Sequence, residues 1–204
     1  MSPESGPALD EAPGTARPGP DGRLRCPWAL GTPDYLDYHD QEWGRPVRTV
    51  VGLYERLTLE AFQSGLAWIT ILRKRENFRR AFAGFDPERV AAFTPDDRDR
   101  LLADPGIVRN AAKVDATLHN AEVVAGLGDA FVDLVWTHRV LDRPRPGPGD
   151  ERATSPESVA LAKALKAVGI RFVGPTTAYA LMQAVGLVDD HLLDCEVPDP
   201  AELS

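Results

Sequence analysis

The chain contains only two cysteines and four histidines, and each cysteine has a histidine close to it in sequence. Cys26 precedes His39 by thirteen residues near the start of the chain, and His191 precedes Cys195 by four near its end. Zinc binds a tetrahedral set of two thiolates and two imidazoles. A His-x-x-x-Cys spacing also places both side chains on one face of a helical turn. The sequence therefore predicts one Zn²⁺ per chain, bound by these four residues and joining the two ends of the chain.

Two other interpretations fit the same residues. The cysteines could be unrelated buried thiols beside ordinary histidines, or Cys26 and Cys195 could form a disulfide. The disulfide leaves the spacing of the histidines unexplained. A zinc site with four protein ligands is closed, so it would stabilise the fold rather than catalyse a reaction.

Length and composition predict a single domain without a membrane-spanning segment. The 204 residues fit one domain. The sequence has no apolar run long enough to cross a bilayer, and its polar N-terminus has no signal core. With reduced cysteines, this points to the cytoplasm. The net charge of -8 argues against broad, non-specific binding to nucleic acid.

Apolar periodicity, N-cap residues and glycines predict an all-α protein. Thr94-Pro95 and Ser155-Pro156 have the pattern of an N-cap followed by proline at the first helical position. Glycines 84, 126, 169 and 186 stand where helices are expected to end. The expected helices span 33–43, 49–64, 68–82, 87–92, 95–103, 109–125, 129–138, 155–168 and 175–185. Residues 1–24 are expected to form a disordered tail, 142–153 a surface loop and 196–204 a short C-terminal tail.

One carboxylate interrupts an apolar stripe. In the helix expected at 49–64, the stripe of Val50, Leu53 and Leu57 continues to Glu60, where a leucine would be usual. A carboxylate on a core face is costly unless it is paired or used. Glu60 is therefore either part of a structural salt bridge or a functional carboxylate in a pocket.

Aromatic residues crowd the same part of the chain. A plain hydrophobic core would explain them, but an acid among indole rings also suits a flat cationic ligand, through stacking, cation–π contact and charge. The aromatic residues concerned are Trp28, Tyr35, Tyr38, Trp43 and Trp68.

The region from 157 to 191 has the pattern of a helix-hairpin-helix. An amphipathic helix ends at Gly169, the turn IRFVG occupies 170–174, and a second helix begins at Pro175. Such a turn directs backbone N–H groups and a helix N-terminus towards a phosphate. A generic helical hairpin packed in a core is the alternative.

Together these motifs resemble the 3-methyladenine DNA glycosylase I family, the zinc-containing branch of the helix-hairpin-helix base-excision glycosylases. The resemblance covers residues 25–195, with the helix-hairpin-helix at about 157–185. It is carried by CPW at 26–28, YHDQEWG at 38–44, LEAFQSGLAWITILRKRENFR at 59–79, GIVRNAAKV at 106–114 and FVGPTTAYALMQAVGLVDDH at 172–191.

The resemblance implies a monomeric enzyme that removes 3-methyladenine from alkylated double-stranded DNA and leaves an abasic site. It implies that Glu60 recognises the base, with Tyr38 in the pocket and Trp68 stacking. Trp28, Tyr35 and Trp43 match other aromatics of that pocket. The implied DNA contacts are Gly65 and Leu66, which would fill the gap in the duplex, and Val173, Gly174 and Thr176 of the hairpin. The implied zinc ligands are Cys26, His39, His191 and Cys195.

The resemblance also bears on the type of reaction. Related glycosylases that cut the strand carry a lysine in the hairpin, and that position is Thr176 here. Simple hydrolysis without a lyase step is therefore expected. The usual catalytic aspartate of the superfamily aligns with Asp189, which would either act in catalysis or cap local backbone. The alternatives are a glycosylase for another range of alkylated purines, a non-catalytic zinc-stabilised DNA-binding module, or a zinc hydrolase, which would need an open metal position.

Overall fold

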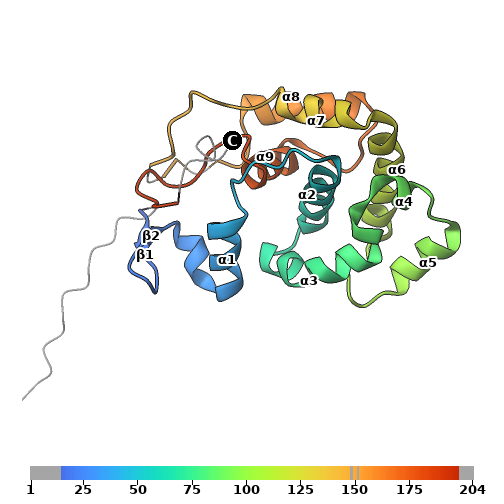
Figure 1. Ribbon diagram of the computed structural model, residues 1–204, viewed down its shortest axis with the longest axis horizontal. Coiled ribbons are helices and arrows are strands. Elements are labelled where there is room, and N and C mark those ends of the chain that lie inside the picture. Colours follow the sequence, from blue (N-terminus) through green and yellow to red (C-terminus); the bar gives the residue numbers. More distant parts are fainter. Residues whose placement is uncertain (1–14, 148, 151, 198–204) are drawn as a thin grey trace, which may run out of the picture.

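The computed structural model describes residues 15–147, 149–150 and 152–197, and most of this part of the chain is helical, as predicted (Figure 1). None of its helices is long and apolar enough to cross a membrane. The α-helices are α1 (Pro33–Gln41), α2 (Val50–Gln63), α3 (Trp68–Ala81), α4 (Pro87–Ala91), α5 (Pro95–Ala103), α6 (Ala111–Leu127), α7 (Asp129–Trp136), α8 (Pro156–Ala167) and α9 (Pro175–Ala184), with short 3-10 helices η1 (Pro27–Gly31) and η2 (Ala83–Phe85).

The predicted helix starts are confirmed. Thr94 accepts a hydrogen bond from the backbone N–H of Asp97, whose carboxylate accepts one from Thr94 in return. Ser155 and Ser158 form the same reciprocal capping box at the start of α8. In both helices proline occupies the first position, where a missing N–H costs nothing.

The predicted helix ends are confirmed at two of the glycines and wrong at Gly126. Gly169 and Gly186, with φ of 103° and 72°, follow α8 and α9 in the left-handed conformation that a helix C-terminus favours. The residue after each glycine closes the helix: the N–H of Ile170 donates to the carbonyl of Leu165, and the N–H of Leu187 donates to the carbonyl of Met182. Helix α6 instead continues through Gly126 to Leu127, because the positive φ that ends it is at Gly128.

The N-terminal segment departs from the predicted disordered tail. Strands β1 (Arg17–Pro18) and β2 (Leu24–Arg25) form a small antiparallel hairpin. The carbonyl of Leu24 accepts a hydrogen bond from the N–H of Glu196 at 2.9 Å, and the N–H of Ala16 bonds to the carboxylate of Asp194. The prediction of disorder is therefore wrong for residues 15–24, which are ordered by a segment distant in sequence. Residues 1–14 and 198–204 lie outside the described residues.

Helix α2 lies at the centre of the fold and packs against α3, α6, α7 and α9 (Figure 1). Its core-facing side is buried together with Phe78 of α3 and Phe82 just after that helix, whose rings are stacked. A second, smaller apolar cluster surrounds Cys26 and Cys195 at the other end of the molecule. Helix α1, the β1–β2 hairpin and the C-terminal segment gather at this end, so the two termini of the described chain meet beside α1 (Figure 1).

Candidate functional site

A cavity of about 360 Å³ lies where α1, α2, the start of α3 and α9 meet. The structure brings together all six residues predicted for base binding in its wall. The lining residues are Trp28, Tyr35, Tyr38, Trp43, Glu60, Gln63, Trp68, Ala180 and Gln183. Aromatic rings, one acid and two amides around such a space can enclose a flat heterocycle and hydrogen-bond to its edge.

Glu60 is buried in the last turn of α2, with 6% of its surface exposed. It forms no ion pair with any described residue, so the salt-bridge alternative is wrong for this carboxylate. Burial raises the pKa of Glu60 to about 8, although the charge of Arg56 opposes this shift. A carboxyl group with so high a pKa and no ion-pair partner in the described part of the chain is a strong candidate for binding a ligand in the cavity.

Arg56 lies one turn before Glu60 but is bound to a different acid. Its Nη2 donates to Glu42 Oε2 at 2.6 Å, and Arg75 donates to both oxygens of the same carboxylate at 2.6 and 2.7 Å. Burial opposes ionisation of Glu42, but the two guanidinium groups hold its pKa below the ordinary value. This cluster ties the end of α1 to α2 and α3, the helices that carry Tyr38, Glu60 and Trp68.

The tyrosines have separate roles in the cavity wall. Tyr38 is buried with its ring centroid 5.4 Å from that of Trp68, and burial together with the charge of Glu60 raises the pKa of its hydroxyl. The hydroxyl therefore remains protonated and can donate a hydrogen bond. The hydroxyl of Tyr35 accepts a hydrogen bond from the N–H of Ile69 at 3.0 Å. It thus caps α3, whose N-cap residue Ala67 has no side-chain acceptor, a role that the sequence did not reveal.

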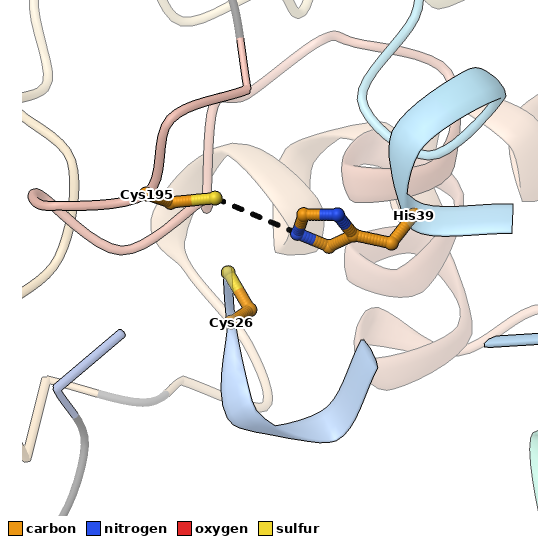
Figure 2. Close-up of side chains that lie close together, drawn as sticks. All are labelled: Cys26, His39 and Cys195. Atoms are coloured by element: carbon orange, nitrogen blue, oxygen red, sulfur yellow. Dashed lines mark hydrogen bonds between the residues drawn. The ribbon is translucent and has the colours of Figure 1, made fainter. Parts of the chain in front are cut away.

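The three residues Cys26, His39 and Cys195 form a candidate metal centre beside this cavity. Figure 2 shows their side chains pointing into one space from the start of η1, from α1 and from the C-terminal segment. Their ligand atoms all lie within 4.8 Å of one another, and Cys195 Sγ is 3.6 Å from His39 Nε2. Both cysteines are free thiols, so the structure does not favour the disulfide alternative.

His191, the fourth predicted ligand, lies next to this group but outside the set within 4.8 Å. Its ring centroid is 5.0 Å from that of His39, and its Nε2 is buried without a hydrogen-bond partner among the described residues. In both histidines Nδ1 bonds to a carboxylate, Asp40 for His39 at 2.8 Å and Asp189 for His191 at 2.9 Å. This leaves Nε2 as the ligand atom, and a histidine backed by a carboxylate is typical of zinc sites. The donor set therefore fits a zinc ion.

Two tryptophans connect the metal centre to the cavity. Trp28 packs edge-on against His39 at 5.2 Å between ring centroids, and Trp43 packs against His191 at 4.7 Å. Both tryptophans also line the cavity. The position of the histidines therefore fixes one wall of the cavity.

Asp189 is placed beside His191 and does not line the cavity. One of its oxygens accepts from the backbone N–H and pairs with Nδ1 of His191, and the other is held by Arg145 in an ion pair. The guanidinium of Arg145 also donates to the carbonyls of Cys195 and Val197. These contacts favour a positioning role for Asp189, and its catalytic role stays a prediction.

The residues predicted for DNA binding lie on two segments with different exposure. Gly65, Leu66 and Thr176 are exposed, and Gly174 is the half-buried N-cap of α9. The side chain of Val173 is buried in the core at 3% exposure, so only its backbone groups can contact DNA.

The chain matches the methyladenine glycosylase family over residues 28–198, a region that contains the whole cavity lining. The chain belongs to this family. The chain is 42% identical over 177 residues to the DNA-3-methyladenine glycosylase of Haemophilus influenzae, covering 84% of this chain and 96% of the relative. It is 43% identical to DNA-3-methyladenine glycosylase 1 of Escherichia coli over 178 residues, covering 84% and 95% of the two chains.

Solved structures agree with this assignment. A crystal structure of 3-methyladenine DNA glycosylase I matches this chain with a TM-score of 0.79 and 44% identity, over 84% of this chain and 98% of the other. A tyrosine-to-phenylalanine variant of 3-methyladenine DNA glycosylase I in complex with 3-methyladenine matches with a TM-score of 0.76 and 36% identity, over 84% and 97% of the two chains. The all-α glycosylase fold predicted from the sequence is thereby confirmed.

Proposed function

We propose that this protein is a base-excision repair enzyme that hydrolyses the N-glycosidic bond of 3-methyladenine in alkylated double-stranded DNA. The observation that carries the proposal is Glu60, a buried carboxyl group without an ion-pair partner among the described residues, in a cavity walled by aromatic rings. The named activity of the relatives supports the same substrate.

The chemistry of the lesion sets what the protein must provide. Methylation at N3 makes the nucleoside cationic and weakens its glycosidic bond, so the leaving base needs no added proton. The enzyme must unstack the nucleotide, hold its base and leave the sugar accessible to water. A cavity that favours a cationic aromatic ring meets this requirement, because neutral adenine gains less from an acid among indole rings.

Each part of the wall has a role in this scheme. Trp68 stacks on the base, Glu60 accepts hydrogen bonds from its edge, and the protonated hydroxyl of Tyr38 donates to it. Trp28, Trp43 and Tyr35 close the remaining sides and exclude water from the face of the ring. Burial disfavours ionisation of Glu60, so a cationic base is the partner that restores its charge.

We further propose that Cys26, His39, His191 and Cys195 hold one zinc ion with a structural role. When bound, zinc links the N- and C-terminal segments and adds its binding energy to the stability of the fold. This ligand set is supported by the buried Nε2 of His191, which has no hydrogen-bond partner in the described part of the chain, and by the carboxylates bonded to Nδ1 of both histidines. The reaction itself depends on the cavity, and the two tryptophans that pack on the histidines transmit the position of the metal centre to its wall.

DNA binding is assigned to two segments that each accept a hydrogen bond from a side chain of α6, from Lys113 at Ser64 and from Asn120 at Arg171. Leu66, in the loop between α2 and α3, would fill the space left by the flipped nucleotide, with Gly65 allowing the turn through its φ of 81°. The backbone around Gly174 and the hydroxyl of Thr176 would contact phosphate. Because Thr176 replaces a lysine, no Schiff base can form there and the strand is not cut.

Release of free bases from methylated duplex DNA tests the proposal, with 3-methyladenine resolved from 7-methylguanine. We expect selective release of 3-methyladenine and intact strands. Release of several alkylated purines at similar rates would favour the broader glycosylase instead. Binding to DNA without release of any base by the folded, zinc-loaded protein would contradict the proposal and favour a DNA-binding module.

A further inference from the structure

Phe172, in the turn between α8 and α9, combines two unfavourable features. Its φ is 58°, in the left-handed region that non-glycine residues rarely adopt, and 41% of its surface is exposed to solvent. Ala83 and Phe85 are the other described non-glycine residues with positive φ, and neither is exposed. Backbone strain at an exposed aromatic residue is not explained by packing, and such strain gathers at functional sites.

Helix α6 holds this strained turn in place. The side chain of Asn120 forms two hydrogen bonds with the residue before Phe172, accepting from the N–H of Arg171 at 2.7 Å and donating to its carbonyl at 3.0 Å. The preceding residue of the helix, His119, bonds through Nε2 to the carbonyl of Gly169 at 3.0 Å. The amide of Asn120 thus pairs both backbone groups of the residue before Phe172 and holds the backbone of the strained turn.

Lys113 joins the same turn to the loop between α2 and α3. It lies two turns before Asn120 on α6, and only 6% of its surface is exposed. Its Nζ donates to the carbonyls of Phe62 and Ser64, both at 2.7 Å, and lies 5.8 Å from the centroid of the Phe172 ring. The ammonium group therefore donates hydrogen bonds to carbonyls at the C-terminus of α2 and also contacts the aromatic ring of Phe172.

Through Lys113, these contacts link the segments that carry two exposed apolar residues, Leu66 and Phe172. Leu66 is 41% exposed and lies two residues after Ser64, whose carbonyl Lys113 binds. Phe172 has the same exposure, and its ring lies 5.8 Å from the same ammonium group. The polar side chains of α6 thus brace a loop and a turn that carry one exposed apolar side chain each.

We propose that Phe172 is a second apolar residue that contacts duplex DNA beside the flipped nucleotide, positioned by Asn120 and Lys113. The inference rests on the proposed function, since it assumes a flipped nucleotide in the cavity. Apolar side chains that press against or between base steps recur in proteins that bend DNA.

Three neighbouring features favour a duplex as the partner of this surface. The exposed cationic residue Arg171 precedes Phe172, and the turn leads directly into α9. The N-cap of α9, Gly174, provides no side-chain hydrogen bond, which leaves the first N–H groups of the helix for phosphate oxygens. The loop with Leu66 also leads directly into Trp68 of the cavity wall. An apolar contact flanked by phosphate contacts fits a DNA groove better than it fits an apolar protein surface.

Phe172→Ala and Phe172→Gly test the inference, with Val159→Ala as the matched control, because Val159 is 51% exposed near the start of α8, at the opposite end of that helix from the turn. Three quantities would be measured: the dissociation constant for a duplex with a tetrahydrofuran abasic site, that for free 3-methyladenine, and the melting temperature. We expect both Phe172 variants to bind the duplex about tenfold more weakly, the usual cost of a lost aromatic contact to nucleic acid. Affinity for the free base should not change, because Phe172 does not line the cavity.

The remaining readouts separate a DNA contact from a structural role. Phe172→Gly should melt at the same temperature as wild type or higher, since glycine adopts the positive φ without strain. The dependence of duplex affinity on salt should keep its slope, because no phosphate contact is lost. Asn120→Ala should weaken duplex binding through the same contact, and the Asn120→Ala/Phe172→Ala double variant should bind no more weakly than Phe172→Ala.

Two results would overturn different claims. Wild-type duplex affinity in Phe172→Ala, with excision of 3-methyladenine by wild type intact, would refute this inference alone. A large fall in melting temperature in both Phe172 variants, with duplex and free-base affinity falling together, would show a structural role and refute it as well. Failure of wild type to excise 3-methyladenine would instead refute the proposed function.

Discussion

Gln183 Nε2 donates a hydrogen bond to Asp190 Oδ2 at 2.8 Å, and this contact orients an amide in the wall of the base cavity. Asp190 is fixed in turn by the hydroxyl of Tyr179 and by the guanidinium of Arg143. An ionised carboxylate only accepts hydrogen bonds, so the amide must present its nitrogen to Asp190. Gln183 also lines a second cavity together with Asp190, so the amide lies in the wall between the two cavities. We infer that its oxygen is left as an acceptor for the base cavity.

This arrangement predicts a role for Asp190 in selecting the base. Adenine has an amino group where guanine has a carbonyl oxygen, so a fixed amide oxygen favours the adenine lesion. We expect Asp190→Asn, which no longer dictates the orientation of Gln183, to lower kcat/KM for 3-methyladenine about tenfold. The preference over 3-methylguanine should fall as well. Gln183→Met should have the same effect, whereas Gln63→Met in the same cavity should keep the preference. Equal losses for both lesions in Asp190→Asn would contradict this role.

Glu60→Gln should lower kcat/KM for 3-methyladenine excision by about a hundredfold while the protein stays folded, because the amide cannot balance a cationic base. Burial raises the pKa of Glu60 to about 8, and kcat/KM reports the ionisation of the free enzyme. For wild type, kcat/KM should therefore rise with pH up to about 8 and then level off. Single-turnover excision on either side of this pKa checks it, and the rise should be absent in the variant. Full activity of Glu60→Gln would remove the carboxylate from the mechanism.

The same carboxyl group should make stability depend on pH. Burial raises its pKa from 4.5 to about 8, so between these values the folded protein binds more protons than the unfolded chain. The contribution of Glu60 to the free energy of unfolding must then fall as pH rises through this window. We expect Glu60→Gln to be more stable than wild type at about pH 9 by a few kcal/mol, with a smaller difference at about pH 5. Urea unfolding at the two pH values measures the difference in unfolding free energy between the variant and wild type. The same difference at both pH values would be inconsistent with the raised pKa.

Removal of zinc should destabilise the protein and its cavity together. We expect one zinc per chain by atomic emission, and we expect Cys195→Ala to lose the metal and to melt at least about 10 °C lower, given the size of structural zinc binding energies. His191→Ala should also lose zinc, which would identify it as the fourth ligand. Its unchanged zinc content would leave Cys26, His39 and Cys195 as the only protein ligands in this set.

Tyr35→Phe tests whether the hydroxyl that caps α3 matters for the cavity. The variant removes the acceptor for the N–H of Ile69 and keeps the ring in the wall. We expect a loss of about 1 kcal/mol in unfolding free energy, typical of a lost cap. Affinity for free 3-methyladenine should also fall, because Trp68 begins the uncapped helix. Unchanged stability would show that water replaces the hydroxyl without cost.

Local signals in the sequence determined the helices, because the caps at Thr94 and Ser155 and the left-handed glycines 169 and 186 act through neighbouring residues. The anomaly at Glu60 was also visible from periodicity, since a helix face is a local property. The spacing of the cysteine and histidine residues suggested a metal site before any tertiary contact was known.

Only the tertiary structure decided what depends on contacts between distant segments. The order of residues 15–24 comes from pairing with the segment around Glu196, and the roles of Tyr35, Gln183 and Asp190 come from partners on other elements. The strain at Phe172 is likewise tolerated because Asn120 of α6, some fifty residues earlier, forms hydrogen bonds with the backbone of the turn. Hydrogen bonds of this kind leave no period or spacing in the sequence, because their geometry is set by the packing of whole helices and not by the residues next to them.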